Sequence, residues 1–421
     1  MRTDVAYAHE LDAQDPLADF KERFVITDPD LIYLDGNSLG RLPKATKTLM
    51  DELLHDWGER LIRIWSEKHF GIAREVGDKL ADLLGAQHDE VIIGESTSVN
   101  MFKLFVAALQ LQEGRKRIVT DDLNFPSDLY VLQEINHMLG NRHEIEVVPS
   151  SDSIMGPVEG IKALLDEETA FLTLTNTVFK SAYTYDMADL NVAAKEVGSL
   201  VVWDLSHSVG SVPIDLNGSG ADMAIGCTYK YVNGGPGSPA FLYIRRDLQE
   251  KLRNPIAGWM SQKNQFDFGL EYEPLDGIGR FLTGTPHVLS MAPIGVGVDL
   301  LLEAGMDRVR EKSVAQTEYL IALWKEHLKP HGFTLNSPRD AKWRGSHVAV
   351  GHPEGWRVNQ SMIKDMKIIP DFRAPDNIRL GVTPMYTSFT DLHTAVMRMK
   401  KIMEEKLYEK YATNSSGIGV T

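Results

Sequence analysis

Short runs of apolar and β-branched residues recur between residues 91 and 244, and helix-like patterns fill most of the gaps between them. The runs are VII (91–93), RIVT (117–120), EIEVV (144–148), AFLTLT (170–175), LVVWDL (200–205), ADMAIG (221–226) and PAFLYI (239–244). Strands that alternate with helices predict right-handed βαβ units and a mostly parallel sheet. The segment TYKYVNGGPGS between the last two runs is too short for a helical crossover, so the seventh strand is expected to run antiparallel.

Helical spacing dominates on either side of this region. Before it, one amphipathic helix is predicted to run through Gly58, and another is expected to end at Gly85. The first rests on Met50, Leu53, Leu54, Trp57, Leu61, Ile64 and Trp65, and the second on Ile72, Val76, Leu80 and Leu83. After it, helical stretches (293–304 and 306–329) lead to strand-like segments at 347–353 and 377–384 and to a last helix from about Thr390.

The predicted fold class is therefore α/β, with a seven-stranded mostly parallel sheet that has one antiparallel strand and is flanked by helices, plus a smaller α+β C-terminal domain. The large domain is expected to span residues 41–290 and the small domain residues 291–412. Residues 1–40 are expected to pack near the small domain. The polar, Gly- and Ser-containing tail, residues 413–421, is expected to be frayed.

Composition indicates which binding partners and which cellular compartment to expect. The 421 residues carry a formal net charge of −15, which argues against a nucleic-acid or anionic-membrane partner, since either would call for a basic patch. No apolar run approaches the length of a membrane span, and the acidic N-terminus lacks the apolar core of a signal peptide. The single cysteine, Cys227, cannot form an intrachain disulfide, so a cytoplasmic location is expected. The thirteen histidines show no metal-binding spacing, so no metal is expected.

Candidate chemistry lies where predicted strands end, because ligands of open parallel sheets bind at the carboxyl ends of the strands. GESTSVN (94–100) ends the first strand directly before a helix, which suits a phosphate, although the segment alone favours simple helix capping by Ser96 or Thr97. Asp204 ends the strand LVVWDL, with His207 shortly after it. A carboxylate there can bond the protonated ring nitrogen of pyridoxal phosphate, although a helix cap or a loop salt bridge would also explain it.

Lys230 follows the strand ADMAIG and lies beside Tyr229. A partly desolvated lysine at a strand end can form a Schiff base with an aldehyde, and a neighbouring tyrosine can hold a phosphate or pass a proton. A surface lysine before a Gly-rich turn is the alternative, and Lys180 has a similar setting. What favours Lys230 is the order of the three signals, a phosphate loop, then Asp204, then Lys230, all at strand ends of one sheet.

Two further residues are ambiguous on sequence grounds alone. Cys227 is expected to be a small buried apolar residue. Arg379, in the predicted strand NIRLGVTP, can clamp a carboxylate through two hydrogen bonds, but its position alone favours a surface ion pair.

Six segments together resemble the kynureninase family, and they run in order over nearly the whole chain. They are YLDGNSLG (33–40), NFPSDLY (124–130), WDLSHSVGSVPIDL (203–216), GADMAIGCTYKYVNGGPGSPAF (220–241), RGSHVAV (344–350) and IRLGVTPMYTSFTD (378–391). This family belongs to the pyridoxal-phosphate enzymes of the aspartate-aminotransferase fold, fold type I. The resemblance therefore implies an enzyme whose large domain binds pyridoxal 5'-phosphate.

The resemblance also implies roles for individual residues. Lys230 would bond to the cofactor aldehyde, Asp204 would pair with its ring nitrogen, and Tyr229 would contact the phosphate and donate a proton late in the reaction. The remaining cofactor contacts would come from Thr97, Ser98, Phe125, Ser127, Asp128, Thr175 and His207, and from Trp259 and Thr285 of a neighbouring subunit, which implies a homodimer. Arg379 would bind the substrate α-carboxylate, which reverses the surface-pair interpretation. Asn37 would lie near it, and Trp65 would also contact the substrate.

The implied reaction is hydrolysis of the Cβ–Cγ bond of L-kynurenine to anthranilate and L-alanine in tryptophan and kynurenine catabolism. Trp65 and Thr285 resemble the bacterial, kynurenine-preferring form of the family, and 3-hydroxy-L-kynurenine stays open as a substrate. The stretch NTVFKSAY after Thr175 departs from bacterial relatives. Rival functions are a cysteine desulfurase, which needs a mobile cysteine in the small domain, an aminotransferase, and an idle cofactor-binding regulator, which would bring a basic DNA-binding module.

Overall fold

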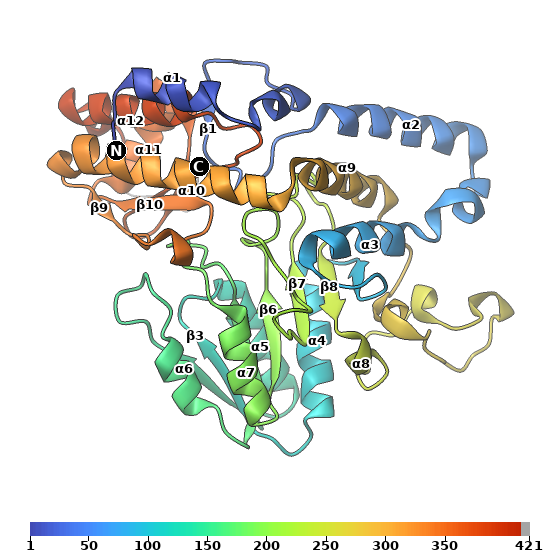
Figure 1. Ribbon diagram of the computed structural model, residues 1–421. Coiled ribbons are helices and arrows are strands. Elements are labelled where there is room, and N and C mark those ends of the chain that lie inside the picture. The colour runs from blue at the N-terminus through green and yellow to red at the C-terminus, as the bar shows by residue number, and fades with distance from the viewer. Residues whose placement is uncertain (414–421) are drawn as a thin grey trace.

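A computed structural model describes residues 1–413 and shows a seven-stranded sheet in the order β2-β8-β7-β6-β5-β3-β4 (Figure 1). The strands are β2 (Val91–Ile93), β3 (Arg117–Asp121), β4 (Glu144–Val148), β5 (Thr169–Thr175), β6 (Leu200–Asp204), β7 (Met223–Gly226) and β8 (Phe241–Ile244). Every neighbouring pair is parallel except the two that involve β8. The predicted sheet and its antiparallel seventh strand are confirmed. The expected tail falls almost wholly on residues 414–421, which lie outside the described residues.

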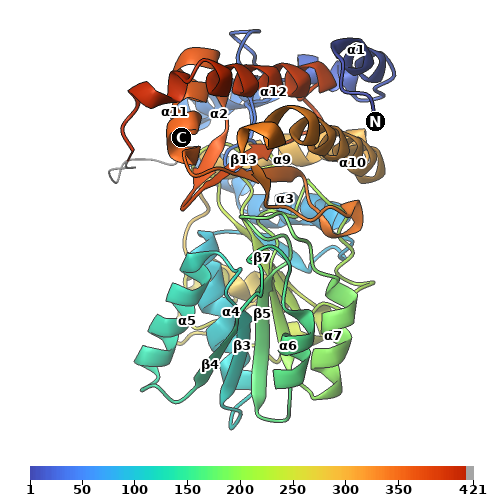
Figure 2. The same cartoon turned by 90° about the vertical axis from the view of Figure 1, so that its left-hand side faces the viewer.

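Helices cover both faces of this sheet. The helices α4 (Thr97–Leu111) and α5 (Pro126–Met138) pack on each other, and α6 (Val158–Leu164) packs on α7 (Met187–Glu196). Figure 2 shows the sheet between these two pairs. β5 and β6 are buried along their whole length, which explains their uninterrupted apolar pattern.

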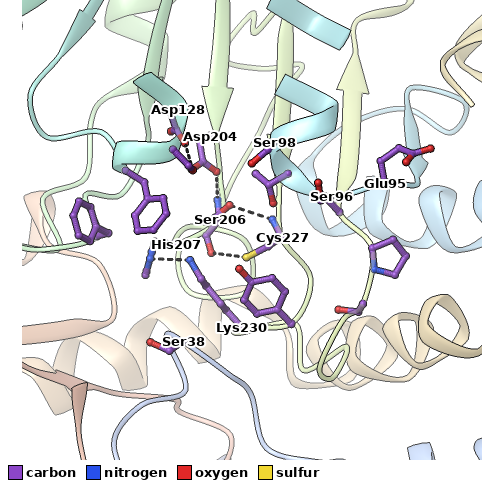
Figure 3. Close-up of a pocket in the computed structure, with 18 of the residues that line it drawn as sticks. Ser38, Glu95, Ser96, Ser98, Asp128, Asp204, Ser206, His207, Cys227 and Lys230 are labelled. Atoms are coloured by element: carbon purple, nitrogen blue, oxygen red, sulfur yellow. Dashed lines mark hydrogen bonds between the residues drawn. The ribbon is translucent and has the colours of Figure 1, made fainter. Parts of the chain in front are cut away.

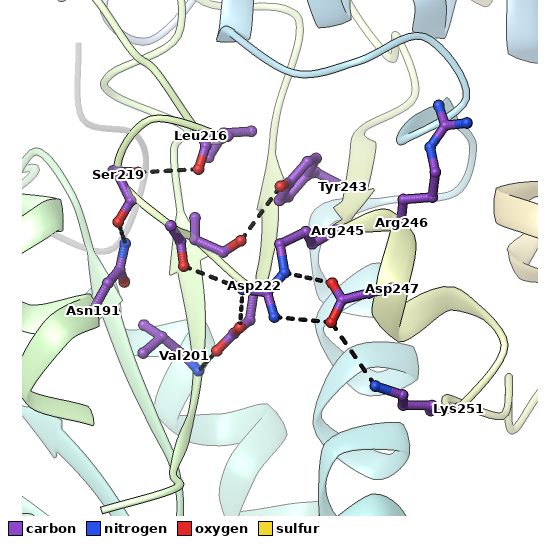
Figure 4. A network of polar contacts seen from close by, with 12 residues as sticks. Asn191, Val201, Leu216, Ser219, Asp222, Tyr243, Arg245, Arg246, Asp247 and Lys251 are labelled. Atoms are coloured by element: carbon purple, nitrogen blue, oxygen red, sulfur yellow. Dashed lines mark hydrogen bonds and ion pairs between the residues drawn. The ribbon is translucent and has the colours of Figure 1, made fainter. Parts of the chain in front are cut away.

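A polar network fixes the end of the sheet remote from the strand carboxyl ends of β6 and β7 (Figure 4). The Asp222 carboxylate accepts a hydrogen bond from the Val201 amide at 3.0 Å and forms an ion pair with Arg245 at 2.7 Å. Arg245 directly follows β8 and also pairs with Asp247, at the start of the short helix α8 (Arg246–Gln249). The network thereby ties β6, β7 and β8 together at one end and leaves the opposite end for loops.

The C-terminal part contains a four-stranded antiparallel sheet in the order β12-β13-β10-β9. Its strands are β9 (Thr334–Leu335), β10 (His347–Gly351), β12 (Asp371–Arg373) and β13 (Asn377–Gly381), and its helices are α10 (Met306–Leu323), α11 (Gly355–Met366) and α12 (Phe389–Glu404). These elements enclose a second hydrophobic core, separate from that of the large sheet.

The N-terminal residues lie against this second core. Helix α1 (Val5–Ala13) packs on α12, and β1 (Ile32–Tyr33) pairs in parallel with β11 (Ile368–Ile369). The Asp12 carboxylate accepts hydrogen bonds from the amides of Phe389 and Thr390 and so caps α12. The division of the chain into domains at residues 40, 290 and 412 stays a prediction.

The helix expected through Gly58 ends earlier than predicted. Helix α2 (Lys44–Arg60) stops because Leu61 adopts a left-handed φ of 52°, and a single π-helical turn (Trp65–His69) follows before α3 (Ile72–Leu84). Three of the seven apolar residues that carried the prediction are exposed, Leu54 at 50%, Trp57 at 61% and Leu61 at 62%, whereas Leu53 and Ile64 are buried. These three side chains form an apolar surface on and just after α2 that residues 1–413 leave uncovered.

Among residues 1–413, no single helix has the length and apolar character needed to cross a membrane. The pair formed by α9 (Val288–Ala304) and the helical segment Met306–His331 meets that requirement only when both are counted together, and the two are bent by 81° at their junction. Both contribute many residues to the two cores described above.

Candidate active site

A cavity of about 760 Å³ opens at the carboxyl ends of the large-sheet strands, next to the N-terminal segment and the small antiparallel sheet (Figure 3). It brings together most of the residues singled out from the sequence. The predicted residues that line it are Asn37, Thr97, Ser98, Phe125, Ser127, Asp128, Asp204, His207, Tyr229 and Lys230. They come from five separate stretches of the chain; four of these follow strands of the parallel sheet, and Asn37 belongs to the N-terminal segment.

Lys230 stands in the loop after β7, and its Nζ lies 2.9 Å from Nε2 of His207. Burial and the neighbouring positive charge of Lys230 lower the pKa of His207 well below its ordinary value. The imidazole is therefore neutral and accepts a hydrogen bond from the lysine amine. The loop is held from the other side, because the Gly40 amide donates to the Tyr229 carbonyl at 2.8 Å.

Two buried carboxylates face the same cavity. Asp204, the last residue of β6, accepts a hydrogen bond from the Ser206 amide at 2.8 Å, and burial raises its pKa. Burial and the negative charge of Asp204 raise the pKa of Asp128 well above its ordinary value, while Lys230 acts in the opposite direction on both. Two such groups create a place where an additional positive charge would be stabilised.

The N-terminus of α4 forms a further wall of the cavity. Ser96 caps the helix by accepting a hydrogen bond from the Val99 amide at 3.4 Å, so the interpretation of this loop as a helix cap holds for Ser96. This cap still leaves donors for a phosphate, because the first-turn amides of a helix have no acceptors within the helix. Thr97 and Ser98 of this turn line the cavity. Phe125, directly before α5, presents an aromatic ring that is 43% exposed and meets Phe179 edge-on at 5.2 Å.

These groups fit pyridoxal phosphate. The amine of Lys230 can bond to the aldehyde carbon, the carboxylate of Asp204 can face the protonated ring nitrogen, and the α4 terminus can take the phosphate. The ring nitrogen would supply the positive charge that the buried pair of Asp128 and Asp204 favours. Among the described residues, no group of three or more His, Cys, Asp or Glu side chains is arranged to hold a metal ion.

Five predicted site residues do not line the cavity. Thr175 is buried beside Asp204 in the sheet, where its amide donates to Oδ1 of Asn124 at 2.5 Å. Thr285 lines a smaller neighbouring cavity that also contains Lys103 and Glu95. Trp65 and Trp259 belong to a peripheral aromatic cluster in which successive ring centroids, from Trp65 through Phe70 and Phe266 to Trp259, are 5.6 to 5.8 Å apart.

Arg379 is the fifth, and it lies fully buried behind the cavity wall. Its Nη1 donates to the Phe179 carbonyl at 2.6 Å, its Nη2 donates to Oγ of Ser38 at 3.1 Å, and it forms a close ion pair with Asp371. Burial lowers the pKa of Arg379 to about 10, so the guanidinium is still charged at neutral pH.

The cavity also contains residues that sequence reasoning missed. They are Phe179, Ser206, His287 and Arg373, and Ser38 was named only as part of a motif. Phe179 lies in the segment NTVFKSAY, between β5 and α7. Arg373 belongs to the three-residue strand β12, which is too short to give a periodic signal. Cys227 is 1% exposed, as expected of a small buried residue, although it contributes to the cavity lining.

Solved structures with the same fold support the class of the protein. The chain superposes with a TM-score of 0.79 on an apo cysteine desulfurase from Thermococcus onnurineus NA1, at 18% identity and with 96% of this chain and 99% of that chain covered. A variant of the enzyme C-DES with glycine covalently linked to its PLP cofactor gives a TM-score of 0.75 at 18% identity, covering 88% and 97%. These likenesses show the fold. Together with the kynureninase relatives described next, the fold defines a pyridoxal-phosphate-dependent enzyme of fold type I.

Sequence relatives narrow this class. The chain is 40% identical over 404 residues to the kynureninase of Pseudomonas fluorescens, which covers 94% of this chain and 95% of the relative. It is 38% identical over 414 residues to the kynureninase of Burkholderia mallei, with 96% and 97% covered. The family model "Kynureninase C-terminal domain" matches residues 309–399. The chain belongs to the kynureninase family.

Proposed function

We propose that this enzyme hydrolyses the Cβ–Cγ bond of L-kynurenine to give anthranilate and L-alanine, with pyridoxal 5'-phosphate bonded to Lys230. The observation that carries the proposal is the cavity in which Lys230, the buried Asp204 and the N-terminus of α4 meet, in a chain of this family. The cofactor, when bound, withdraws electrons from the α-carbon of an amino acid and makes bonds at the neighbouring carbons easier to break.

The side chains around the cavity would transfer the proton, hold the cofactor and contact the substrate ring. The amine of Lys230 takes the proton from Cα of the substrate, and the neutral ring of His207, 2.9 Å away, accepts a hydrogen bond from that amine. The buried Asp204 would hold the cofactor by pairing with its ring nitrogen. Phe125 and Phe179 offer aromatic surface within the same cavity.

The bond cleavage balances without any oxidant or reductant. The oxygen of water adds to the γ-carbonyl carbon, which becomes the carboxylate carbon of anthranilate. The electron pair of the Cβ–Cγ bond stays with Cβ, which takes a proton and becomes the methyl group of alanine. We assign that proton delivery to Tyr229. Its pKa is raised by the neighbouring Cys227 and by burial, so the phenol keeps its proton at neutral pH.

Substrate preference and assembly form part of the same proposal. The resemblance of Trp65 and Thr285 to the bacterial form of the family supports L-kynurenine as a substrate, with 3-hydroxy-L-kynurenine left open, and tryptophan and kynurenine catabolism in the cytoplasm is the proposed setting. A homodimer is supported by the exposed apolar face of α2 and by the peripheral positions of Trp259 and Thr285, outside the cavity of their own chain. Those two residues would then complete the partner's site.

A cysteine desulfurase is the alternative that the shared fold raises. That chemistry requires a reactive thiolate on a mobile segment. Cys227 is the only cysteine, it lies next to the strand β7 of the large sheet, and burial raises the pKa of its thiol. These properties disfavour the alternative.

The experiment is a fluorescence assay for anthranilate with the cofactor-loaded protein and L-kynurenine. Wild type is expected to release anthranilate and an equal amount of L-alanine, and Lys230→Ala is expected to release none. Lys180→Ala is the matched control, because Lys180 does not line the cavity. Wild type that forms no anthranilate would refute the substrate, and activity retained in Lys230→Ala would refute the role of the lysine. A parallel assay with 3-hydroxy-L-kynurenine tests the preference.

A further inference from the structure

Glu95 stands at the boundary between the main cavity and the smaller cavity beside it, and it lines both. The residue directly precedes Ser96, the N-cap of α4, so its backbone belongs to the loop that fits the cofactor phosphate. Its carbonyl accepts a hydrogen bond from the Ala240 amide at 2.8 Å, directly before β8. The backbone of Glu95 is therefore fixed to the large sheet.

Glu95 adopts a backbone conformation that is unusual for its residue type. Its φ is 57°, in the left-handed region where a residue with a Cβ stays only when its surroundings hold it. Oε1 of Glu95 accepts a hydrogen bond from the Thr283 hydroxyl and lies 3.8 Å from Nζ of Lys103. Figure 3 shows the carboxylate directed away from Lys230 and Asp204. The side chain thus points out of the main cavity, toward a neighbouring segment.

The segment that Glu95 reaches is bonded to a second piece of chain. The Thr283 carbonyl accepts a hydrogen bond from the Met260 amide at 2.8 Å. We call these two pieces, residues 258–260 and 281–285, the strap. Through its hydrogen bond with Thr283, Glu95 joins the strap to the phosphate loop of the same chain.

Lys103 supplies a second anchor of the strap and balances the charge. It is 1% exposed, and its Nζ donates to the Phe281 carbonyl at 2.9 Å. A carboxylate in a phosphate loop would repel the phosphate if no cation compensated it, and Lys103 lies close enough to do so. An acid can therefore serve as an anchor at this position without opposing the binding of an anion.

The strap carries Trp259 and Thr285, which both lie outside the cavity of their own chain. In the proposed homodimer these two residues complete the partner's site. Trp259 directly precedes Met260, and Thr285 follows Thr283 by two residues, so their positions depend on what anchors the strap.

We propose that Glu95 is a positioning residue, which anchors the strap of its own chain and thereby sets the cofactor affinity of the partner's site. The inference rests on the homodimer of the proposed function and does not depend on the identity of the substrate. Without the anchor, Trp259 and Thr285 would have to be ordered during cofactor binding, and the cost of that ordering would lower the affinity.

Three substitutions test the anchor through cofactor affinity. Glu95→Ala removes the acceptor, Thr283→Val removes the donor without changing the phosphate loop, and Glu95→Gln keeps an oxygen that can accept the hydrogen bond. The cofactor-loaded proteins are dialysed to equilibrium against a series of pyridoxal 5'-phosphate concentrations, and the absorbance of cofactor bonded to Lys230 is recorded. A hydrogen bond to a charged group corresponds to about 10- to 100-fold in binding, so Glu95→Ala and Thr283→Val should weaken the affinity by that factor and Glu95→Gln by less. Glu134→Ala, which removes an exposed acid on α5, is the matched control.

Mixed dimers, purified through a different tag on each protomer, show in which site Glu95 acts. One protomer carries Lys230→Ala, so the absorbance reports only the site of the protomer that keeps Lys230. In the first arrangement Glu95→Ala is in the protomer that keeps Lys230, whose site receives an intact strap, and the affinity should equal that of wild type. In the second arrangement Glu95→Ala is in the Lys230→Ala protomer, whose strap completes the reporting site, and the affinity should fall by about 10- to 100-fold.

The outcomes separate this inference from the proposed function. A loss in the first arrangement, a loss in both, or no loss in either would overturn the role of Glu95. Thr283→Val is taken through the same two arrangements and decides the question if Glu95→Ala does not fold. A wild type that sediments as a monomer would refute the proposed dimer and this inference with it. A dimer that forms no anthranilate but loses affinity only in the second arrangement would refute the proposed reaction and support the role of Glu95.

Discussion

Lys103 offers the sharpest test of the electrostatics, because it is a buried lysine that the proposed reaction does not use. It lies on α4 with 1% exposure, its Nζ donates to the Phe281 carbonyl at 2.9 Å, and it is 3.8 Å from Oε1 of Glu95. Burial lowers the pKa of Lys103 to about 8, and Glu95 opposes that shift. Replacement by methionine keeps the volume and removes the titrating group.

The sign of the pH dependence follows from the two states of the chain. In the unfolded chain Lys103 titrates near its ordinary value of 10.5, whereas in the folded protein it loses its proton near pH 8. Below pH 8 both states hold the proton, and the cost of burying the charge is fully present. As the pH rises from 8 toward 10.5, the folded protein is relieved of this cost while the unfolded chain stays charged. The stability of wild type relative to Lys103→Met should therefore rise by about 2 kcal/mol between pH 7.5 and pH 10.

Differential scanning calorimetry measures this difference. An unfolding entropy of about 2.1 cal/mol/K per residue converts 2 kcal/mol into a Tm difference of about 2 to 3 °C for a chain of this length. Tm is recorded for cofactor-loaded wild type and Lys103→Met at both pH values, so that groups common to both proteins cancel. Lys195→Met, which removes an exposed lysine on α7, controls for the loss of one charge. A Tm difference that stays constant with pH, or that moves against wild type, would refute the reasoning.

Three further outcomes are expected. Tyr229→Phe should slow anthranilate formation by about 100-fold or more while the absorbance of bound cofactor is retained, and unchanged turnover would contradict the proton-donor role. Gly297→Ala should lower stability by about 1–3 kcal/mol, since a Cβ there would overlap the Val232 carbonyl in the loop that follows Lys230. Gly58→Ala, inside α2 with nothing near the added Cβ, should instead raise stability by about 0.5–1 kcal/mol in thermal unfolding. Trp57→Asp on the exposed face of α2 should convert a dimer into monomers in sedimentation velocity, and a wild type that already sediments as a monomer would refute the dimer.

The sequence predicted the large sheet well because six of its seven strands are almost wholly buried, the edge strand β4 being the exception. A strand such as β5, covered on both sides by helices, reads as a continuous apolar run. Such a run can be recognised in the sequence without knowing how the strand pairs with its neighbours. The same reasoning failed on α2. Its apolar spacing is genuine, but the predicted continuation to Trp65 assumed that the face would be buried in this chain, and Leu61 instead breaks the helix. Periodicity reports that a face is apolar, not which chain covers it.

The candidate site was predictable only where a residue follows a strong strand. Asp204 and Lys230 stand at the ends of buried runs, so their meeting follows from the parallel sheet. The relation of Arg373 to Arg379 depends instead on the register of a three-residue strand against its neighbour, for which the sequence gives no pattern. Phe179 was hidden for a similar reason, since it lies in an irregular segment after β5 whose path is set by contacts such as that between Arg379 and its carbonyl.

The charges of the cavity are divided between the two sheets, and this division can orient a substrate. The buried carboxylates Asp128 and Asp204 belong to the large sheet and its helices, whereas the guanidinium groups of Arg373 and Arg379 belong to the small sheet. Lys230 lies between them beside the neutral His207. A cofactor ring held at the carboxylate side and an α-carboxylate held at the arginine side would bring the α-carbon near the lysine amine.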